Sequence, residues 1–135
     1  MDTQTKGDLA ELRVAAAIRK LGYTVLLPFT ESQQYDLVSD VGDEFIRVQV
    51  KYASLTDNGK VKVSCYGPNS SKSGNNTTFY TEDDIDGIAA FCGDTEQVYW
   101  VPIEEANKYT VTLSEDGKHS FEAHKFGEAF PHRKT

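Results

Sequence analysis

The sequence predicts a single α/β domain in which helices flank a mixed β-sheet. Three observations support this prediction. Apolar residues near the N-terminus repeat at helical spacing, several later segments have the composition of strands, and a second helical pattern interrupts those segments. The chain of 135 residues can bury a core of its own and contains no boundary signal, so we expect one domain over residues 1–135.

The first helix is expected to begin at Thr5 and to end at Gly22. Thr5 and Asp8 have the spacing of a capping box, in which side chains satisfy the first backbone N–H groups of a helix. Glycine tolerates the left-handed backbone that ends many helices, which suits Gly22. Between these ends, the apolar residues at helical spacing are Ala10, Val14, Ala17, Ile18 and Leu21.

Strands are expected in four segments after this helix, over residues 23–29, 35–41, 44–54 and 60–66. The turn signal Asp57-Asn58-Gly59 separates the last two. Residues 67–77 are almost exclusively Gly, Pro, Asn and Ser, with Lys72, and predict a long loop.

The second half of the chain predicts a helix and further strands. Thr81 and Asp84 have the spacing of another capping box, so a helix is expected through Ile85, Ile88, Ala89 and Phe91. Residues 97–103 are strongly apolar and predict a strand. Residues 109–113 and the stretch after Gly117 indicate a late hairpin or extension, and residues 131–134 are expected to fray.

Composition excludes several classes of protein. No apolar stretch approaches the roughly 18 residues that span a bilayer, and residues 1–6 carry no secretory signal, so we expect no membrane partner. Cys65 and Cys92 have no metal-ligand or redox spacing. They are interpreted as reduced core residues of a cytoplasmic protein.

Charge is unevenly distributed along the chain, whose net charge is −7. Residues 44–76 contain five basic and two acidic residues, whereas residues 82–105 contain eight acidic residues and no basic one. One face could therefore meet phosphate while another faces solvent or a partner subunit. An uneven distribution arising by chance is the alternative.

The predicted strand over residues 44–54 has two different faces. Side chains on a strand alternate between faces, so the apolar face carries Ile46, Val48, Val50 and Tyr52. The opposite face carries the long polar side chains Arg47, Gln49 and Lys51.

Pairing this strand with the one before it predicts a cluster. If Gly42-Asp43 is a two-residue hairpin turn, Asp36 lies directly across from Gln49. Cross-strand neighbours on one face have Cβ atoms about 4.5–5.5 Å apart. Asp36, Gln49 and Lys51 are therefore expected to converge on one patch.

This patch has the chemistry of a metal-assisted hydrolytic site. The Asp36 carboxylate, the Gln49 amide oxygen and the Val50 carbonyl offer oxygen ligands of the kind that Mg²⁺ prefers, with Mn²⁺ as an alternative. Lys51 could orient an attacking water or stabilise charge that develops on a phosphate. Glu11, at the edge of the helix's apolar stripe, could bind a second metal or a water of the first. A purely structural role for the hairpin residues is the alternative, with Lys51 paired to Asp36.

The arrangement resembles the PD-(D/E)XK nuclease superfamily, whose pattern is a helical Glu, an Asp at a strand start and a (Glu/Asp/Gln)-x-Lys strand. The matching stretches are Lys6-Gly7-Asp8-x-x-Glu11, Tyr35-Asp36-Leu37-Val38 and Gln49-Val50-Lys51. With Gly22-Tyr23, they are similar to archaeal Holliday junction resolvases. They are more similar to PD-(D/E)XK homing endonucleases of bacterial group I introns, as is Tyr99-Trp100-Val101-Pro102.

The resemblance implies a restriction-endonuclease-like core and a catalytic set of Glu11, Asp36, Gln49 and Lys51. This sequence departs from the pattern at two positions. Tyr35 stands where the motif has proline, and Gln49 replaces the usual carboxylate. The second departure removes a negative charge from the metal site, which should weaken metal affinity.

Three functions are compatible with this site. The leading hypothesis is a homing-type endonuclease that cuts double-stranded DNA at a specific site, and the resemblance implies a homodimer or homotetramer. A resolvase acting on four-way junctions is the first alternative. The second is a non-catalytic DNA-binding module on a nuclease fold.

DNA contacts are expected from a strand and a loop beside the site. Lysine can meet phosphate, and amide side chains can read base edges in the major groove. The candidate residues are Lys60, Lys62, Asn69, Ser71, Lys72 and Asn75. A solvated surface loop is the alternative interpretation of residues 67–77.

Overall fold

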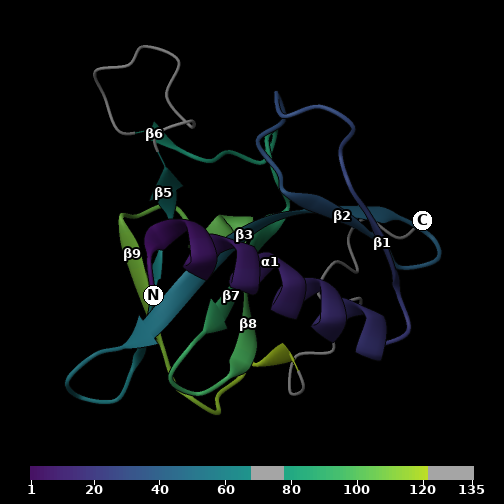
Figure 1. The fold of residues 1–135 in the computed structure, drawn as a ribbon. Helices are drawn as coiled ribbons and strands as arrows, with labels where there is room; N and C mark the ends of the chain where they lie inside the picture. Colours follow the sequence, from purple (N-terminus) through teal and green to yellow (C-terminus); the bar gives the residue numbers. More distant parts are fainter. Residues whose placement is uncertain (68–77, 122–135) are drawn as a thin grey trace.

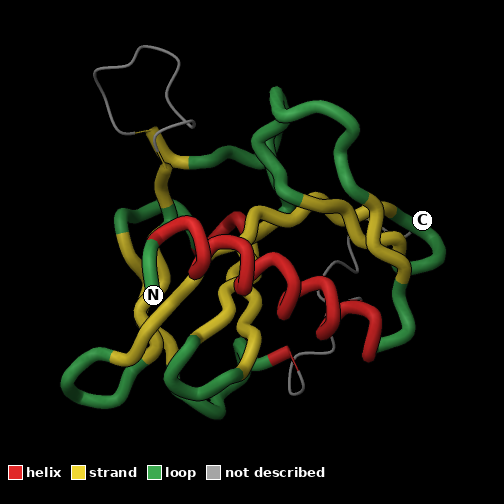
Figure 2. The backbone as a smooth tube through the Cα atoms, viewed as in Figure 1, coloured by secondary structure: helices red, strands yellow, loops and turns green. Residues whose placement is uncertain are grey.

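A seven-stranded sheet with one α-helix across it forms the centre of the molecule (Figures 1 and 2). The computed structural model describes residues 1–67 and 78–121. Strand β3 pairs in parallel with β7, whereas the other strand pairs are antiparallel, so the predicted mixed sheet of an α/β domain is confirmed. Among the described residues one α-helix covers this sheet, where the sequence predicted two.

Helix α1 (Thr3–Lys20) begins two residues earlier than the sequence predicted. The N-cap is Asp2, not Thr5: the Asp2 carboxylate accepts a hydrogen bond of 2.7 Å from the backbone N–H of Thr5. Aspartate is among the strongest N-cap residues, which explains the earlier start. The helix ends as predicted, with Gly22 in a left-handed conformation at φ +96°. Its buried face consists of Ala10, Val14 and Ile18 and packs mainly against β3 and β7.

Strands β1 (Thr24–Leu26), β2 (Leu37–Asp40) and β3 (Phe45–Leu55) form an antiparallel meander. In the β2–β3 hairpin Leu37 faces Val48, and the Val41 N–H bonds the Glu44 carbonyl over 3.1 Å. This is the register predicted from a two-residue turn. Both β1 and β2 are shorter than expected.

Residues 81–92 contain the main error of the sequence prediction. Thr81 and Asp84 do form side-chain hydrogen bonds, but they close a turn and do not open a helix. The apolar run that follows is strand β7 (Gly87–Cys92), buried throughout and paired with β3 and β8 (Gln97–Pro102). A short apolar run suits a strand covered on both faces as well as it suits a buried helix, so the pattern was ambiguous.

The remaining elements extend the sheet and add a small ribbon. Strand β4 (Val61–Ser64) pairs with the end of β3 and with β9 (Thr110–Leu113), which follows the 3₁₀ helix η2 (Ile103–Glu105). Strands β5 (Tyr66–Gly67) and β6 (Thr78–Phe79) form a separate two-stranded ribbon. After Gly117, Ser120 makes one antiparallel bridge with Tyr99. The predicted loop at 68–77 and the predicted fraying at 131–134 lie outside the described residues.

Apolar side chains form two buried clusters. One cluster joins α1 to β2, β3 and β7, and the other joins β4, β7, β8 and β9. Cys65 and Cys92 are buried free cysteines, as predicted. Within residues 1–67 and 78–121, no helix is long and apolar enough to cross a membrane.

Candidate active site

The β2–β3 hairpin positions Asp36 beside the middle of β3. The Asp36 N–H donates to the Val48 carbonyl over 2.8 Å, which continues the hairpin ladder one residue past β2. Its carboxylate Oδ2 accepts a hydrogen bond of 2.8 Å from the Val50 N–H. Asp36 is thereby held next to Gln49, as the predicted register required.

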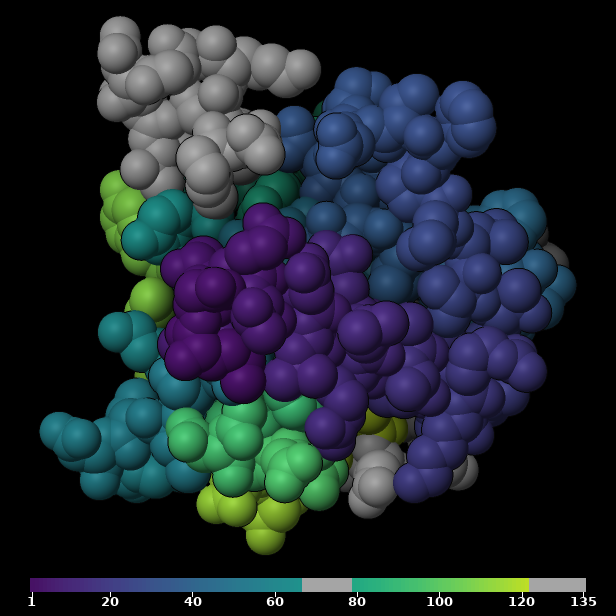
Figure 3. All heavy atoms as spheres, viewed as in Figure 1, coloured from purple at the N-terminus to yellow at the C-terminus, as the bar shows by residue number. Residues whose placement is uncertain are grey.

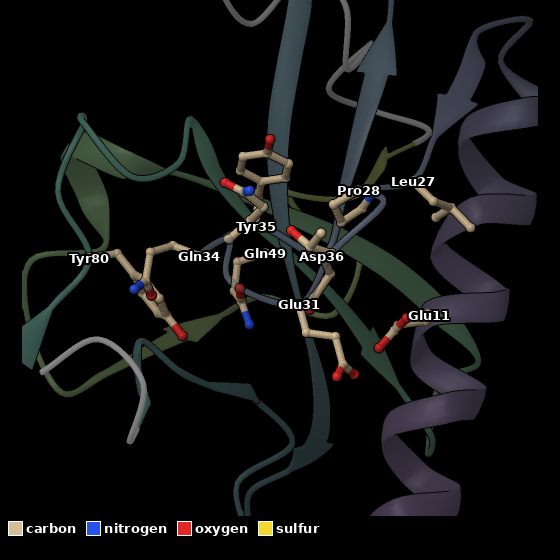
Figure 4. Close-up of a pocket in the computed structure, with 11 residues that line it drawn as sticks. Glu11, Leu27, Pro28, Glu31, Gln34, Tyr35, Asp36, Gln49 and Tyr80 are labelled. Carbon is tan, nitrogen blue, oxygen red and sulfur yellow. The ribbon is translucent and has the colours of Figure 1, made fainter. Parts of the chain in front are cut away.

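A pocket of about 400 Å³ lies in front of these two residues (Figure 4). Glu11 faces it from α1, while Asp36 and Gln49 come from the hairpin. Helix α1 and the segment after β1 lie side by side on the face of the molecule shown in Figure 3. The lining residues are Glu11, Leu27, Pro28, Thr30, Glu31, Gln33, Gln34, Tyr35, Asp36, Gln49 and Tyr80.

Lys51 lies beside this pocket and is absent from its lining. Its ammonium donates to the Tyr66 carbonyl over 2.9 Å and sits 5.7 Å from the centre of the Tyr80 ring. Burial lowers the pKa of Lys51, and the nearby charge of Asp36 opposes that shift. The structure therefore brings Glu11, Asp36 and Gln49 around one pocket, with Lys51 at its side.

The carboxyl groups of the pocket influence one another. Burial raises the pKa of Asp36, against the Val50 N–H and the Lys51 charge, which lower it. The Glu11 side chain is exposed as a whole, yet partial burial of its carboxyl end raises its pKa, and Asp36 and Asp8 add to the shift. Both carboxylates are costly to ionise here, and a cation between them would reduce that cost.

The donor atoms around the pocket suit a hard divalent cation. Among the described residues, no group of three or more His, Cys, Asp and Glu side chains gathers closely enough to bind a metal alone. Mg²⁺ commonly binds through one or two carboxylates and keeps several waters. Asp36, the amide of Gln49 and the carboxylate of Glu11 fit this mode in an open pocket, and the main chain of Val50 is adjacent.

Glu31 and Tyr80 are two of the pocket-lining residues that were not predicted from the sequence. Glu31 comes from the segment between β1 and β2, and no periodic pattern sets the direction of a side chain there. Tyr80 is buried and follows β6. Its sequence context does not distinguish it from an ordinary aromatic residue of the core. In Figure 4 the carboxylates of Glu31 and Glu11 both point into the pocket.

Arg47, from the same face of β3, has a structural environment. Its guanidinium donates to the Asp83 and Glu82 carbonyls at 2.7 Å and pairs with Asp86 at 3.3 Å. Asp86 is only 3% exposed and also accepts the Arg47 backbone N–H over 2.7 Å. Arg47 therefore secures the turn before β7.

The predicted DNA-binding residues divide into two groups. Lys62 is exposed on β4, opposite Ser54 of β3. Lys60 is exposed but lies before β4, not on it, because its backbone closes a turn with Thr56. Asn69, Ser71, Lys72 and Asn75 lie outside the described residues.

Comparison with known proteins agrees with the motif and the fold. A sequence model of the PD-(D/E)XK endonuclease family matches residues 1–129. This chain belongs to the PD-(D/E)XK endonuclease family.

The fold of this PD-(D/E)XK nuclease is similar to the solved structure of a bacterial homing endonuclease, I-Ssp6803I. The similarity covers 100% of this chain and 99% of that one, with a TM-score of 0.79 and 23% sequence identity. At this identity the likeness establishes the fold alone. No curated protein sequence matches the chain. The resemblance found in the sequence is thus confirmed, and the PD-(D/E)XK family generally uses divalent metal ions.

Proposed function

We propose that this PD-(D/E)XK nuclease is a metal-dependent endonuclease that hydrolyses phosphodiester bonds of double-stranded DNA at a specific site. One observation carries the proposal. Asp36 and Gln49 lie across from one another in the β2–β3 hairpin and line one pocket with Glu11, while Lys51 flanks it. This arrangement places oxygen ligands for a metal and a neighbouring ammonium together, which supports metal-assisted hydrolysis of a phosphodiester.

The proposed roles follow from the chemistry of each group. Asp36, Gln49 and the Val50 carbonyl would hold Mg²⁺, with Mn²⁺ as an alternative, and Glu11 would bind a second ion or a water. When bound, the ion would neutralise phosphate charge and make a bound water easier to deprotonate. The Lys51 ammonium would orient that water or stabilise the charge of the transition state.

DNA is proposed to approach across the pocket and the β4 side of the sheet. Lys60 and Lys62 supply exposed positive charge beside β3. We also assign phosphate or base contacts to Asn69, Ser71, Lys72 and Asn75. Phosphate contacts would provide affinity, while amide side chains would provide part of the sequence readout.

A homodimer or homotetramer is also proposed, because an assembly with two active sites could cut both strands in one encounter. Exposed apolar residues support self-association: Leu26, Leu27 and Phe45 line one shallow hollow and are 42%, 73% and 58% exposed. Apolar surface of this kind often marks a protein interface.

Two reduced cysteines suit a cytoplasmic protein.

Cleavage of mixed substrates tests the proposal. The protein is incubated with Mg²⁺ and either a library of linear duplexes or a set of four-way junctions, and the cut positions are mapped. We expect cuts at one duplex sequence. Cuts in junctions regardless of sequence would identify a resolvase, and DNA binding without cleavage would identify a non-catalytic module.

A further inference from the structure

The Lys51 ammonium is in contact with the protein on two sides. It donates to the Tyr66 carbonyl of β5 over 2.9 Å, and it lies 5.7 Å from the ring centre of Tyr80. A cation within about 6 Å of an aromatic ring centre is attracted by the ring's electron-rich face. The Tyr66 carbonyl and the Tyr80 ring therefore determine where the Lys51 ammonium lies.

Lysine needs such contacts to act from a fixed position. Its ammonium sits at the end of a flexible four-carbon chain and has three donors. The Tyr66 carbonyl takes one donor, which leaves others for a water or a phosphate oxygen. A group whose position is fixed before the reaction stabilises developing charge without further reorganisation.

The Tyr80 ring is itself firmly placed. The residue is 6% exposed, lines the pocket with Asp36 and Gln49, and directly follows β6. The next residues form the turn in which the Thr81 N–H bonds the Asp84 carboxylate over 3.0 Å. Arg47 of β3 donates hydrogen bonds to the carbonyls of this turn. The segment that carries Tyr80 is therefore anchored to the strand that carries Lys51.

We propose that Tyr80 is a positioning residue whose ring, together with the Tyr66 carbonyl, holds the Lys51 ammonium at the pocket for phosphodiester hydrolysis. The proposal rests on the proposed function. Tyr80 lies outside the Asp-Gln-x-Lys pattern. Its role in catalysis would act through Lys51 and not through direct contact with DNA.

The ionisation of Tyr80 supports this role. Burial, with Asp36 and Asp84, raises the pKa of Tyr80 to about 12, so the phenol stays neutral at physiological pH. A neutral ring attracts the ammonium through its π-face and does not require an ion pair. The contact should therefore survive loss of the hydroxyl group.

Substitutions at position 80 test the proposal by separating catalysis from binding. Tyr80→Phe keeps the ring, and kcat for cleavage should stay within about threefold of wild type. Tyr80→Leu removes the ring, and kcat should fall by roughly tenfold with the DNA Kd unchanged. Incorporation of mono-, di- and trifluorinated phenylalanine at this position weakens the ring face with little change of shape, so kcat should fall stepwise along the series.

Tyr52→Leu is the matched control. The Lys6 ammonium lies 5.5 Å from the Tyr52 ring centre, so this variant removes a similar lysine–tyrosine contact away from the pocket lining. Its kcat should match wild type at a temperature where both proteins are folded, although loss of the Tyr52–Phe91 ring contact should lower its thermal stability.

Two outcomes would overturn the positioning role. One is equal kcat of the Leu and Phe variants, whether both stay near wild type or both fall, and the other is a fluorinated series without a trend. The fluorinated series decides the question even if Tyr80→Leu does not fold. Failure of the proposed function would give a different result from failure of the positioning role. Wild type would then show no cleavage, or Lys51→Ala would cleave normally.

Discussion

At the residue scale, Gln49 is the departure with the clearest chemical consequence. A glutamine offers a metal one neutral oxygen, whereas a glutamate offers a charged carboxylate. Gln49 was predicted from the hairpin register to lie beside Asp36, and it lines the pocket with Asp36 and Glu11. Its role as a ligand stays a prediction.

Two substitutions of Gln49 measure that role. Gln49→Glu should retain cleavage and lower the Mg²⁺ concentration at half-maximal rate by severalfold, because the carboxylate is a stronger ligand. Gln49→Leu has similar bulk but no oxygen, so it should reduce kcat by at least about a hundredfold while the fold persists. Metal titrations of cleavage separate the variants. The same metal dependence in all three proteins would show that Gln49 is not a ligand.

Asp36 illustrates a conflict between activity and stability. Its raised pKa means that the folded state binds the proton more tightly than the unfolded state. The ionised group therefore opposes folding: this penalty is absent below the ordinary pKa and grows as the pH rises through the raised value.

Asp36→Asn should abolish cleavage and raise the thermal midpoint at neutral pH by about 3 °C in the absence of metal. The amide removes the buried charge, and its oxygen can still accept the Val50 N–H. Differential scanning calorimetry in chelator measures the change. A lower midpoint would mean that the carboxylate contributes net stability, contrary to this account.

At the scale of elements, local pairing was predictable from the sequence and long-range pairing was not. The register of β2 and β3 follows from a two-residue turn and the alternation along one strand, so Asp36 and Gln49 were brought together correctly. Strand β7 depends on parallel pairing with β3 across more than thirty residues of sequence separation, which no local pattern encodes. Its apolar run and the Thr81–Asp84 spacing therefore resembled a capped helix. Glu31 and Tyr80 were missed for a related reason, because their positions depend on loops and on the fold around them.

Gly87 distinguishes the strand from the predicted helix. A Cβ at Gly87 would lie 2.6 Å from the Trp100 ring atom Cη2 and 2.7 Å from the Val101 carbonyl oxygen. Gly87→Ala should therefore destabilise the protein by about 2–3 kcal/mol, since neither neighbour has room to move in the packed core. In an exposed helix the same change would stabilise.

Gly7→Ala is the matched control for Gly87→Ala. Gly7 lies in α1, and beyond its chain neighbours and the adjacent helix backbone a Cβ there would meet no described atom within 4 Å. Alanine should stabilise this position by about 0.5–1 kcal/mol. Urea unfolding measures both variants, and a stabilised Gly87→Ala protein would contradict the strand.

At the scale of the whole molecule, the acidic segment of residues 82–105 does not form a simple solvent-facing surface. Asp86 pairs with Arg47, Glu96 pairs with Arg13, and the Asp94 carboxylate accepts the Leu55 N–H. Several of the acidic residues thus stabilise the fold. The positive charge left beside β3 includes Lys60 and Lys62, both exposed.

The double variant Lys60→Ala/Lys62→Ala should weaken DNA binding on all sequences alike. If each lysine neutralises one phosphate, the slope of log K against log salt should become shallower by roughly 0.9 per lost contact. Titrations at several salt concentrations measure this slope, with Lys20→Ala, at the far end of α1, as the control. A slope that stays at the wild-type value would remove these lysines from the DNA interface.

The central claim is metal-dependent cleavage of DNA at the Asp36–Gln49–Lys51 site. Its most direct test is the single-turnover cleavage rate of one mapped duplex by wild type in Mg²⁺, by wild type in EDTA, and by Lys51→Ala in Mg²⁺. We predict cleavage in the first reaction alone, with DNA affinity and thermal stability of Lys51→Ala near those of wild type. Undiminished cleavage by Lys51→Ala, or hydrolysis that continues in EDTA, would contradict the account.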